Sequence, residues 1–344
     1  MSNHTTNIEL CQVDKHDSSL ISEVSQKFTP KKQASELLSA SYNRLGYESK
    51  AERVSSCGTF LEFALQQSSD TWHLRKANFC RDRLCPMCSW RRSYKIYAQI
   101  SQIMNVIEKD YAFLFLTLTV PNCSAVTLSD TIDRLQLGWR KLIHDNKRFK
   151  SSVRGFFRVL EITRNKDRFS PFYNTYHPHF HVILAVDKGY FKSRDYINHS
   201  EWLELWRKAM RDPSITQVDI RRCRNKNELS EGEQFSKSLS SAVAEVAKYS
   251  VKSADYLGKF DKRGFLLSPY SKDDIDSFVT VFSSALYGRR LTAFGGVFDD
   301  VSKSLQLDDI ENGDLVHLDE LELRSDVACL IRRFGWSSGA YKMF

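Results

Sequence analysis

His177-Pro-His-Phe-His-Val-Ile-Leu184 places three histidines at every second position of a short apolar stretch. Successive side chains of a strand point to opposite faces, so a strand here would send all three imidazoles to one face. Imidazole is the commonest side-chain ligand of metals, and the pattern therefore predicts half of a metal site completed from neighbouring strands. Ordinary residues on a solvated strand face are the alternative. That alternative fits less well, because three of only nine histidines fall within five residues.

The stretches around this strand alternate between strand and helix patterns. In chain order they read strand, helix, strand, strand, helix, strand, helix. This order favours an α+β fold with an antiparallel sheet and helices on one face. The predicted strands are 113–120, 154–164, the histidine strand to about 186, and 216–223, and the predicted helices are 128–145, 200–211 and 233–252.

The ends of the chain are less clearly patterned. Residues 1–30 show no clear periodicity and are expected to form a loosely ordered leader. A helical pattern over 31–67 breaks near Gly46 and gives way to a β-like stretch around 59–65, and 93–110 is predicted to be a helix. The acidic tail, 307–322, is either solvated or packed on the body of the protein.

The composition points to an intracellular nucleic-acid-binding protein. The 344 residues carry a net charge of +8, which favours an anionic partner such as nucleic acid. The longest apolar run, 111–120, is shorter than the roughly 20 residues that cross a bilayer. The polar N-terminus lacks the apolar core of a signal peptide. We therefore expect a soluble, cytoplasmic protein with no membrane partner.

Four of the eight cysteines are spaced like metal ligands. Cys80, Cys85 and Cys88 fall within nine residues, and Cys57 lies upstream behind a predicted hairpin. Four thiolates close a tetrahedral structural zinc site. A redox pair of Cys85 and Cys88 is the alternative, but it leaves Cys57 and Cys80 unexplained. The isolated cysteines are interpreted as ordinary thiols: Cys11, Cys123, Cys223 and Cys329.

Basic and aromatic residues alternate directly after the cysteines, in Trp90-Arg-Arg-Ser-Tyr-Lys95. Arg91 and Arg92 are candidates for phosphate contact, with the aromatic rings available for base stacking. A solvated helix start, with Trp90 packed on the zinc module, is an equally good interpretation. Both can hold together.

One tyrosine lies among charged residues in Glu245-Val-Ala-Lys-Tyr-Ser-Val-Lys252. In a helix, Glu245 and Tyr249 share a face, and Lys248 and Lys252 share an adjoining one. A phenol beside a carboxylate and two ammonium groups suits phosphodiester chemistry, because the neutral phenol is a weak nucleophile without help. Spacing alone favours core packing for such a tyrosine. The two lysines are candidates for DNA contact.

Together these segments resemble the rolling-circle replication initiators of small Gram-positive-type bacterial plasmids, within the endonucleases that carry a histidine–hydrophobic–histidine motif. The resemblance covers roughly 55–300 and follows the order of the family. The matching segments are Phe79–Arg92, Phe115-Leu-Thr-Leu-Thr119, Glu161-Ile-Thr163, His177–Val182 and Ala247-Lys-Tyr-Ser-Val-Lys252, and Arg289–Gly296 is also similar.

The resemblance implies a role for each matching residue. His179 and His181 correspond to ligands of a divalent cation, Mg²⁺ or Mn²⁺, and Glu161 to a residue that completes the site. His177 is an extra candidate ligand that the family does not require. Tyr249 corresponds to the nucleophile, and Glu245 to the acid that activates water at termination. Tyr256, seven residues later, is a rival second nucleophile, for which packing is the preferred interpretation.

The resemblance also implies a fold, an activity and partners. The core would be a ferredoxin- or RRM-like nuclease fold that nicks one strand of plasmid origin DNA and gives a 5′-phosphotyrosine link and a 3′-OH primer. A host helicase and DNA polymerase would be partners, and a homodimer is conceivable. The implied domains are a poorly ordered or helical leader (1–50), a zinc module with its following helix (51–110), the endonuclease domain (111–257) and a mainly helical C-terminal region for DNA binding or oligomerisation (258–344).

Two other functions remain open from the sequence. A transposase or conjugative relaxase would use the same chemistry, although the cysteine module and the single strong tyrosine motif favour the plasmid initiator. A zinc-containing DNA-binding regulator would make the histidines incidental. The regulator predicts tight DNA binding without metal-dependent cleavage.

Overall fold

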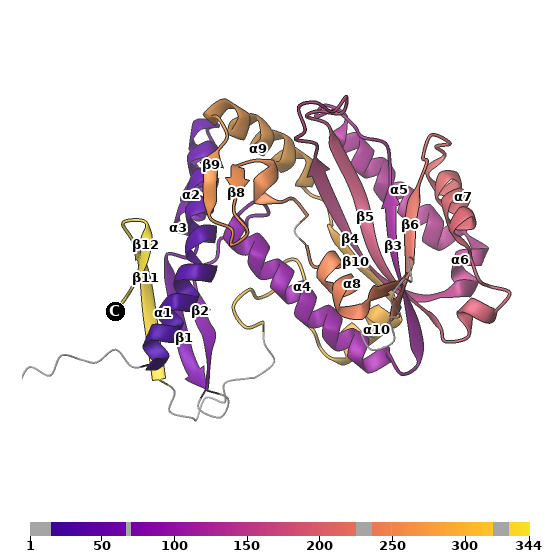
Figure 1. The fold of residues 1–344 in the computed structure, drawn as a ribbon, viewed down its shortest axis with the longest axis horizontal. Helices are drawn as coiled ribbons and strands as arrows, with labels where there is room; N and C mark the ends of the chain where they lie inside the picture. Colours follow the sequence, from indigo (N-terminus) through magenta and orange to yellow (C-terminus); the bar gives the residue numbers. More distant parts are fainter. Residues whose placement is uncertain (1–14, 67–69, 225–235, 249, 319–329) are drawn as a thin grey trace, which may run out of the picture.

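The computed structural model describes residues 15–66, 70–224, 236–248, 250–318 and 330–344. Within these residues the chain folds around two sheets, which the long helix α4 (Pro86–Ile107) connects (Figure 1). None of the described helices is long and apolar enough to cross a membrane. The α+β class with antiparallel sheets is confirmed.

The larger sheet contains the histidine strand at its centre. Its strand order is β10-β4-β5-β3-β6-β7, and every pairing except the parallel β6–β7 pair is antiparallel. The chain passes from β3 through a helix to β4 and β5, and through a second helix to β6, which is the β-α-β-β-α-β order of ferredoxin-like folds. The strands are β3 (Tyr111–Thr119), β4 (Val153–Arg164), β5 (Tyr176–Asp187), β6 (Val218–Arg224), β7 (Ser236–Ser238) and β10 (Thr292–Gly296).

Helices cover both faces of this sheet and not one face as predicted, because β5 is apolar on both sides. Phe180, Val182 and Leu184 join the core under the α5 and α7 side, whereas Ile183 and Ala185 join the core under the α4 and α8 side. The first face carries α5 (Leu128–Asp145), α6 (Lys147–Ser152) and α7 (His199–Met210), and the second carries α4, α8 (Leu239–Val246) and α10 (Val297–Ser304).

The helix predicted over 233–252 is shorter than expected. Residues 236–238 form β7, and α8 ends at Val246, so Lys248 and Lys252 do not lie on one helix face. The reason is a free edge of β4 beyond its pairing with β10. The N–H of Ile162 donates to the carbonyl of Ser250 at 2.8 Å, which draws the chain away from the helix axis and onto the sheet.

Two glycines let β10 approach β4 closely. A Cβ on Gly295 would lie 2.3 Å from the ring of Phe156. A Cβ on Gly296, whose φ is +57°, would lie 2.1 Å from the carbonyl oxygen of Arg154. The Gly295-Gly296 pair is therefore needed for this strand pairing.

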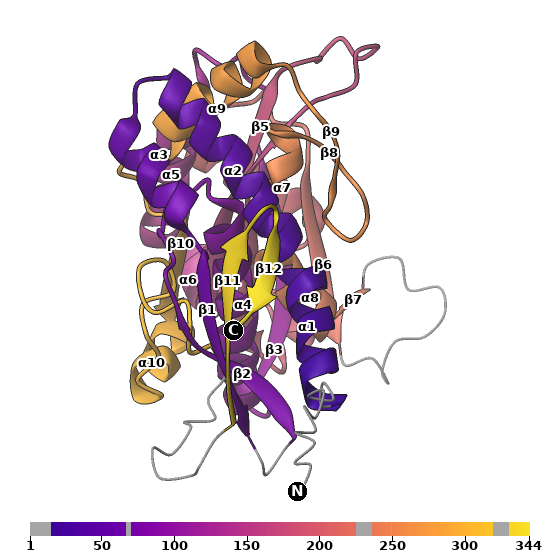
Figure 2. The ribbon, with the colours of Figure 1, turned by 90° about the vertical axis from the view of Figure 1, so that its left-hand side faces the viewer.

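The four-stranded sheet brings together strands from near the N-terminus and from the C-terminal end of the described chain. Its order is β12-β11-β1-β2, with β11 (Leu330–Ser337) paired antiparallel to β1 (Phe60–Gln66). Figure 2 shows the β11–β12 hairpin beside β1 and next to α1 and α2. The remaining members are β2 (Thr71–Ala77) and β12 (Ala340–Met343).

From Lys15 onward the chain is helical, so the expectation of a loosely ordered leader does not hold there and the alternative of a helical leader fits. The helices are α1 (Lys15–Lys27), α2 (Thr29–Arg44) and α3 (Glu48–Ser56). Leu20, Val24 and Phe28 are buried in the core, which explains why this segment packs despite its polar composition. A hairpin of β8 (Gly258–Phe260) and β9 (Leu266–Pro269) and the helix α9 (Lys272–Leu286) also pack on α2.

Helix α4 links the zinc-module side of the protein to the larger sheet. Trp90, near its start, packs edge-on against Phe28 with ring centroids 4.9 Å apart. Ile100, Ile103 and Ile107, near its end, are buried against the sheet, as the predicted helical face required. The acidic tail packs on the middle of α4, since Lys95 Nζ lies 2.8 Å from Asp308 Oδ2.

Candidate metal centres and nicking site

The histidine strand and its neighbour β4 bring three metal-ligating side chains together. Glu161 lies directly opposite His179 in the β4–β5 register, and His181 lies one pleat further along β5. Because all three side chains leave the same face, one ligand atom from each lies within 4.8 Å of the others. All three residues are buried.

Hydrogen bonds fix how the two imidazoles face this cluster. Nδ1 of His179 lies 3.0 Å from the carbonyl oxygen of His177, and Nδ1 of His181 lies 3.2 Å from Oγ1 of Thr117. These contacts turn the Nε2 atoms of both rings toward one point, where they face Oε2 of Glu161. No role for Thr117 is predicted from the sequence, because its place opposite His181 depends on the pairing of β3 with β5.

The separations within the cluster fit a divalent cation. Glu161 Oε2 lies 2.8 Å from His181 Nε2 and 3.4 Å from His179 Nε2, and the two Nε2 atoms are 3.2 Å apart. Ligand atoms in adjacent positions around an octahedral Mg²⁺ or Mn²⁺ lie about 3.0 Å apart. Three such ligands leave other positions open for water or substrate oxygens. Two imidazoles suit Mn²⁺ or a softer ion at least as well as Mg²⁺.

Glu161 is held as a carboxylate. Burial alone would raise its pKa, but hydrogen bonds from His179, His181 and Lys252 outweigh burial and hold the pKa of Glu161 well below its usual range. Nζ of Lys252 lies 2.9 Å from Oε1 of Glu161. Burial lowers the pKa of His181, which keeps its imidazole neutral, the form that binds metals.

His177, the third histidine of the motif, does not belong to the cluster of ligand atoms. Its ring stacks on that of His179, with centroids 5.1 Å apart. Burial, with a smaller contribution from His179, lowers the pKa of His177 to about 4. His177 therefore flanks the cluster as a neutral ring.

Glu245, at the end of α8, lies beside the cluster. Its Oε1 is 3.8 Å from Nε2 of His181 and accepts a hydrogen bond from Nζ of Lys248. Tyr249, the predicted nucleophile, lies outside the described residues. Tyr256 is buried, and its hydroxyl donates to the carbonyl of Leu84, as expected for a packing residue.

The four predicted zinc ligands form a second cluster, at the junction of α3, β2 and α4. The sulfur atoms of Cys57, Cys80, Cys85 and Cys88 all lie within 4.8 Å of one another. Cys57 follows α3, and Cys85 precedes the first residue of α4, Pro86.

The sulfur separations fit a tetrahedral zinc ion. Sγ of Cys88 lies 3.5 Å from that of Cys57 and 3.6 Å from that of Cys80, and sulfurs around zinc lie about 3.8 Å apart. The N–H of Arg81, whose φ is +60°, donates to Sγ of Cys88 at 3.2 Å. The N–H of Cys80 donates to Sγ of Cys57 at 3.3 Å, and such bonds stabilise thiolates.

The two arginines after the cysteines contact the protein's own backbone. The guanidinium of Arg91, which is buried, donates to the carbonyls of Leu315 and Val316. That of Arg92 donates to the carbonyls of Glu311 and Asp82, among others. These contacts tie residues 311–316 of the tail to α4, so this helix start is not simply solvated as one interpretation had it. DNA contact by Arg91 and Arg92 stays a prediction.

Comparison with known proteins gives consistent relatives. The family model Rep_1, described as replication protein, matches residues 71–342. A Protein rep of Bacillus amyloliquefaciens is 40% identical over 284 residues, 80% of this chain and 78% of the relative. A Protein rep of Staphylococcus aureus is 38% identical over 235 residues, 67% of this chain and 95% of the relative. One of Streptococcus pneumoniae serotype 2 is 34% identical over 284 residues, 80% of this chain and 78% of the relative.

No solved structure matches the chain. The family match runs from β2 to the C-terminal hairpin. It includes Cys80, Cys85 and Cys88 and the strands β4 and β5 of the histidine cluster, and therefore most of the geometry described above. The chain therefore belongs to the Rep_1 family of replication proteins, in agreement with the resemblance of its cysteine, histidine and tyrosine segments to plasmid rolling-circle initiators.

Proposed function

We propose that this replication protein is a site-specific single-strand DNA endonuclease and strand transferase that starts rolling-circle replication at a plasmid origin. The observation that carries the proposal is the buried cluster of Glu161, His179 and His181 with the carboxylate of Glu245 at its side, 3.8 Å from His181. The net charge of +8 suits a polyanionic partner.

Glu161, His179 and His181 hold their ligand atoms close together on one face of the sheet. A divalent cation bound there would polarise a non-bridging phosphate oxygen and offset the charge that develops in the transition state. His179 and His181 turn their Nε2 atoms toward the cluster, since their Nδ1 atoms contact the carbonyl of His177 and the hydroxyl of Thr117. Lys252 engages one oxygen of Glu161 and leaves the other toward the imidazoles.

Tyr249 is the proposed nucleophile, on the resemblance of its segment to the family motif. Its phenolate oxygen attacks the phosphorus in line, a new O–P bond forms, and the bond to the 3′ oxygen breaks. The 3′ oxygen takes up a proton and becomes the primer for a host polymerase, while the 5′ phosphate stays on the protein. The described neighbours support this assignment, because Lys248 pairs with Glu245 and Ser250 pairs with Ile162 beside Glu161.

Glu245 is the proposed base for termination. One tyrosine can cleave once, so a second acceptor is needed when the replicated strand is closed. The carboxylate of Glu245 lies beside His181 and is suited to activate a water molecule there. Tyr256 is a poor rival, because it is buried and its hydroxyl is bonded to Leu84.

The test is incubation with a supercoiled plasmid that carries its own origin, with Mn²⁺ or with EDTA. We expect nicked circles and a covalent protein–DNA adduct in Mn²⁺ only. Tyr249→Phe should bind origin DNA and give no adduct. Tight binding with unchanged supercoils would instead indicate a zinc-containing regulator, and an adduct formed by Tyr249→Phe would reject the assigned nucleophile.

Glu245→Ala separates initiation from termination. This variant should still nick the origin, because Tyr249 and the metal ligands are intact, but should release few monomeric single-stranded circles. Glu204→Ala, on the exposed side of α7, is a matched control that removes a helical carboxylate away from the cluster. Normal circle release by Glu245→Ala would contradict the role of Glu245.

A further inference from the structure

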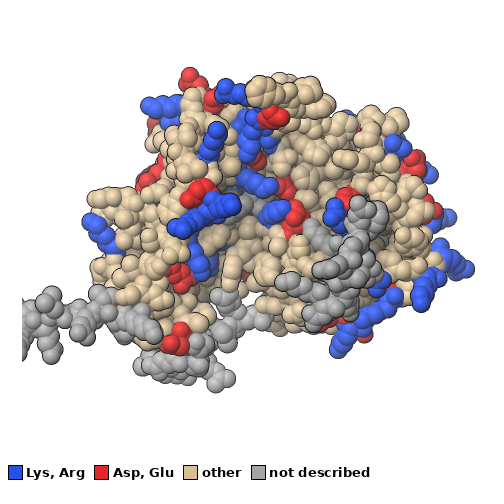
Figure 3. All heavy atoms as spheres, viewed as in Figure 1, with Lys and Arg blue, Asp and Glu red and all other residues tan. Residues whose placement is uncertain are grey.

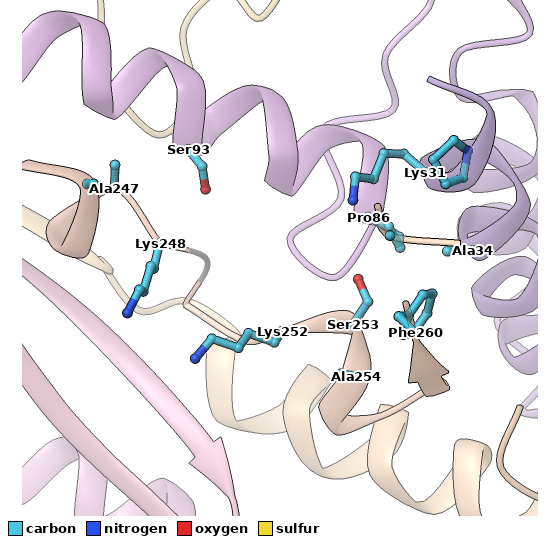
Figure 4. Close-up of a pocket in the computed structure, with 13 residues that line it drawn as sticks. Lys31, Ala34, Pro86, Ser93, Ala247, Lys248, Lys252, Ser253, Ala254 and Phe260 are labelled. Atoms are coloured by element: carbon cyan, nitrogen blue, oxygen red, sulfur yellow. The ribbon is translucent and has the colours of Figure 1, made fainter. Parts of the chain in front are cut away.

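A cavity of about 380 Å³ lies between the N-terminal helices and the segment that follows α8 (Figure 4). Helix α2 supplies Pro30, Lys31 and Ala34, and the start of α4 supplies Pro86 and Ser93. The opposite wall comes from 244–248, from 252–254 and from the β8–β9 hairpin. This volume falls within the usual range of small-molecule sites, about 300–1,000 Å³.

Lysines gather at this cavity. In Figure 3, Lys and Arg side chains surround the hollow between the part of the molecule with α2 and the part with the larger sheet. Lys31, Lys248 and Lys252 line the cavity itself. Two of them are already paired at the metal cluster, Lys248 with Glu245 and Lys252 with Glu161.

Lys31 differs from the other two lysines. Figure 4 shows its side chain extending from α2 toward Pro86 and Ser253. Within the described residues, no hydrogen bond or ion pair is formed by its ammonium group. Burial lowers the pKa of Lys31, and the charge of Asp261 compensates only in part. A Cβ on Gly264 would lie 2.7 Å from Nζ, so the glycine leaves room for this ammonium group.

The remaining walls are largely apolar. Pro86, Ala254 and the ring of Phe260 line the cavity near Lys31. A partly desolvated cation beside an aromatic ring suits a ligand that combines an anionic group with a flat body. Nucleotides have this combination, and a base that stacks on an aromatic side chain binds without sequence preference.

Two of the residues that line the cavity also pair with carboxylates at the metal cluster. Lys252 lines the cavity and pairs with Glu161, and Ala247 and Lys248, which line it too, follow Glu245 in the chain. A DNA strand bound at the cluster could therefore continue past Lys248 and Lys252 and reach α2. This route would give the N-terminal helices, which the nuclease fold itself does not need, a place in substrate binding.

We propose that this cavity binds one unpaired nucleotide of the nicked strand, with a phosphate at Lys31 and the base against Phe260 and Pro86. The inference deepens the proposed function and rests on it. A free nucleotide shares the same chemistry, so the experiment includes both sources. The assignment makes Lys31 a substrate-binding residue outside the nuclease fold.

The first test measures binding of short single-stranded origin oligonucleotides in EDTA by fluorescence anisotropy. We expect Lys31→Met to weaken binding about tenfold and Lys31→Arg to restore most of it. Lys27→Met is the matched control, because Lys27 is exposed on α1 and pairs only with Glu23 among the described contacts, so its effect should be less than about twofold. Equal losses in Lys31→Met and Lys27→Met would overturn the site.

The second test locates the nucleotide. Oligonucleotides with one abasic position at each place around the nick should show one position at which the wild-type protein binds about tenfold more weakly. Ser93→Phe, which fills the cavity from α4 and keeps Lys31, should bind with no such position. The same dependence of affinity on the abasic position in the wild type and in Ser93→Phe would overturn the proposal. So would binding of free deoxynucleotides that depends on Lys31, if no abasic position weakens oligonucleotide binding.

Metal-dependent nicking is measured in parallel, so that the two proposals fail separately. Nicking by the wild type together with unchanged oligonucleotide binding by Lys31→Met would reject the nucleotide site alone. If the wild type never nicks but its oligonucleotide binding depends on Lys31, the proposed endonuclease activity is rejected and the proposed nucleotide site is retained. Circular dichroism of each variant verifies that the fold is retained.

Discussion

Lys252 and Glu161 pair at the edge of the metal cluster, with Nζ 2.9 Å from Oε1, while Oε2 of the same carboxylate lies 2.8 Å from Nε2 of His181. The two oxygens of Glu161 therefore have different partners. This arrangement favours a single oxygen as the metal ligand. It also explains why Glu161 stays ionised although it is buried.

Replacement of Lys252 should weaken metal binding and make it more sensitive to acid. Hydrogen bonding by Lys252 is one of the effects that lower the pKa of Glu161, so Lys252→Met raises that pKa and lets protons compete with the metal at higher pH. We expect Mn²⁺ affinity to fall about tenfold. Calorimetric titration with Mn²⁺ between pH 5 and pH 8 measures both effects. Lys259→Met, at an exposed position of β8, is the control, and equal pH profiles for the two variants would refute the role of Lys252.

His177 should be dispensable for metal binding, unlike the other two histidines of its strand. His179 is oriented by the backbone carbonyl of His177, which His177→Gln retains. We expect His177→Gln to keep Mn²⁺ affinity within about threefold and His181→Gln to lose it about 100-fold or more. Because burial lowers the pKa of His177 to about 4, its NMR signals should not titrate between pH 5 and pH 8. Titration near pH 6.5 would show that the ring is not buried.

Loss of a zinc ligand should destabilise the junction of α3 and α4. Cys85→Ser removes one of four sulfurs that hold these helices together, and structural zinc contributes on the order of the whole stability of a domain, about 5–15 kcal/mol. We expect a low soluble yield, and less than one zinc per chain by elemental analysis. Cys123→Ser, at an isolated thiol, should keep full zinc content. Full zinc content in Cys85→Ser would exclude the four-thiol site.

The sequence predicts the central strands and helices well, because their periodic patterns are long and local. The helix predicted over 128–145 has the boundaries of α5, and the predicted end of the histidine strand lies within one residue of the end of β5. Period-two alternation predicts the candidate ligands His179 and His181, and the family resemblance adds Glu161. Charge alone leaves the packing of the tail on Arg91 and Lys95 open, since it does not distinguish a buried ion pair from a solvated one.

Features set by distant partners could not be predicted. The Lys252–Glu161 pair requires α8 to end at Val246, and that end depends on the free edge of β4, about 90 residues earlier in the chain. The pairing of β11 with β1 joins the two ends of the described chain, and neither strand's own pattern specifies the partner. The nucleotide cavity likewise arises only where α2 meets the segment after α8.

Tyr256 should contribute to stability and not to DNA cleavage. Its buried hydroxyl donates to the carbonyl of Leu84, so Tyr256→Phe removes one hydrogen bond and leaves a buried acceptor, at a cost of about 1–3 kcal/mol. Urea unfolding measures this cost, and the yield of covalent adduct at the origin should match the wild type. We expect a lower urea concentration at the midpoint of unfolding, with a normal yield of covalent adduct and normal release of circles. Failure of circle release alone would make Tyr256 the second nucleophile.

Thr117 should tune the metal centre through His181. Its Oγ1 lies 3.2 Å from Nδ1 of His181, and this contact orients the imidazole so that Nε2 faces the cluster. Thr117→Val keeps the shape of the side chain and removes this hydrogen-bond partner, so we expect about tenfold weaker Mn²⁺ binding. Thr119→Val is the matched control two residues along β3, because the hydroxyl of Thr119 donates to the carbonyl of Gln217 and contacts neither histidine through a described hydrogen bond. Both variants lose one hydrogen bond, so their free energies of unfolding should fall alike, while only Thr117→Val should lose metal affinity. Equal Mn²⁺ affinities of the two variants would mean that the imidazole of His181 is oriented by packing on Phe115 instead.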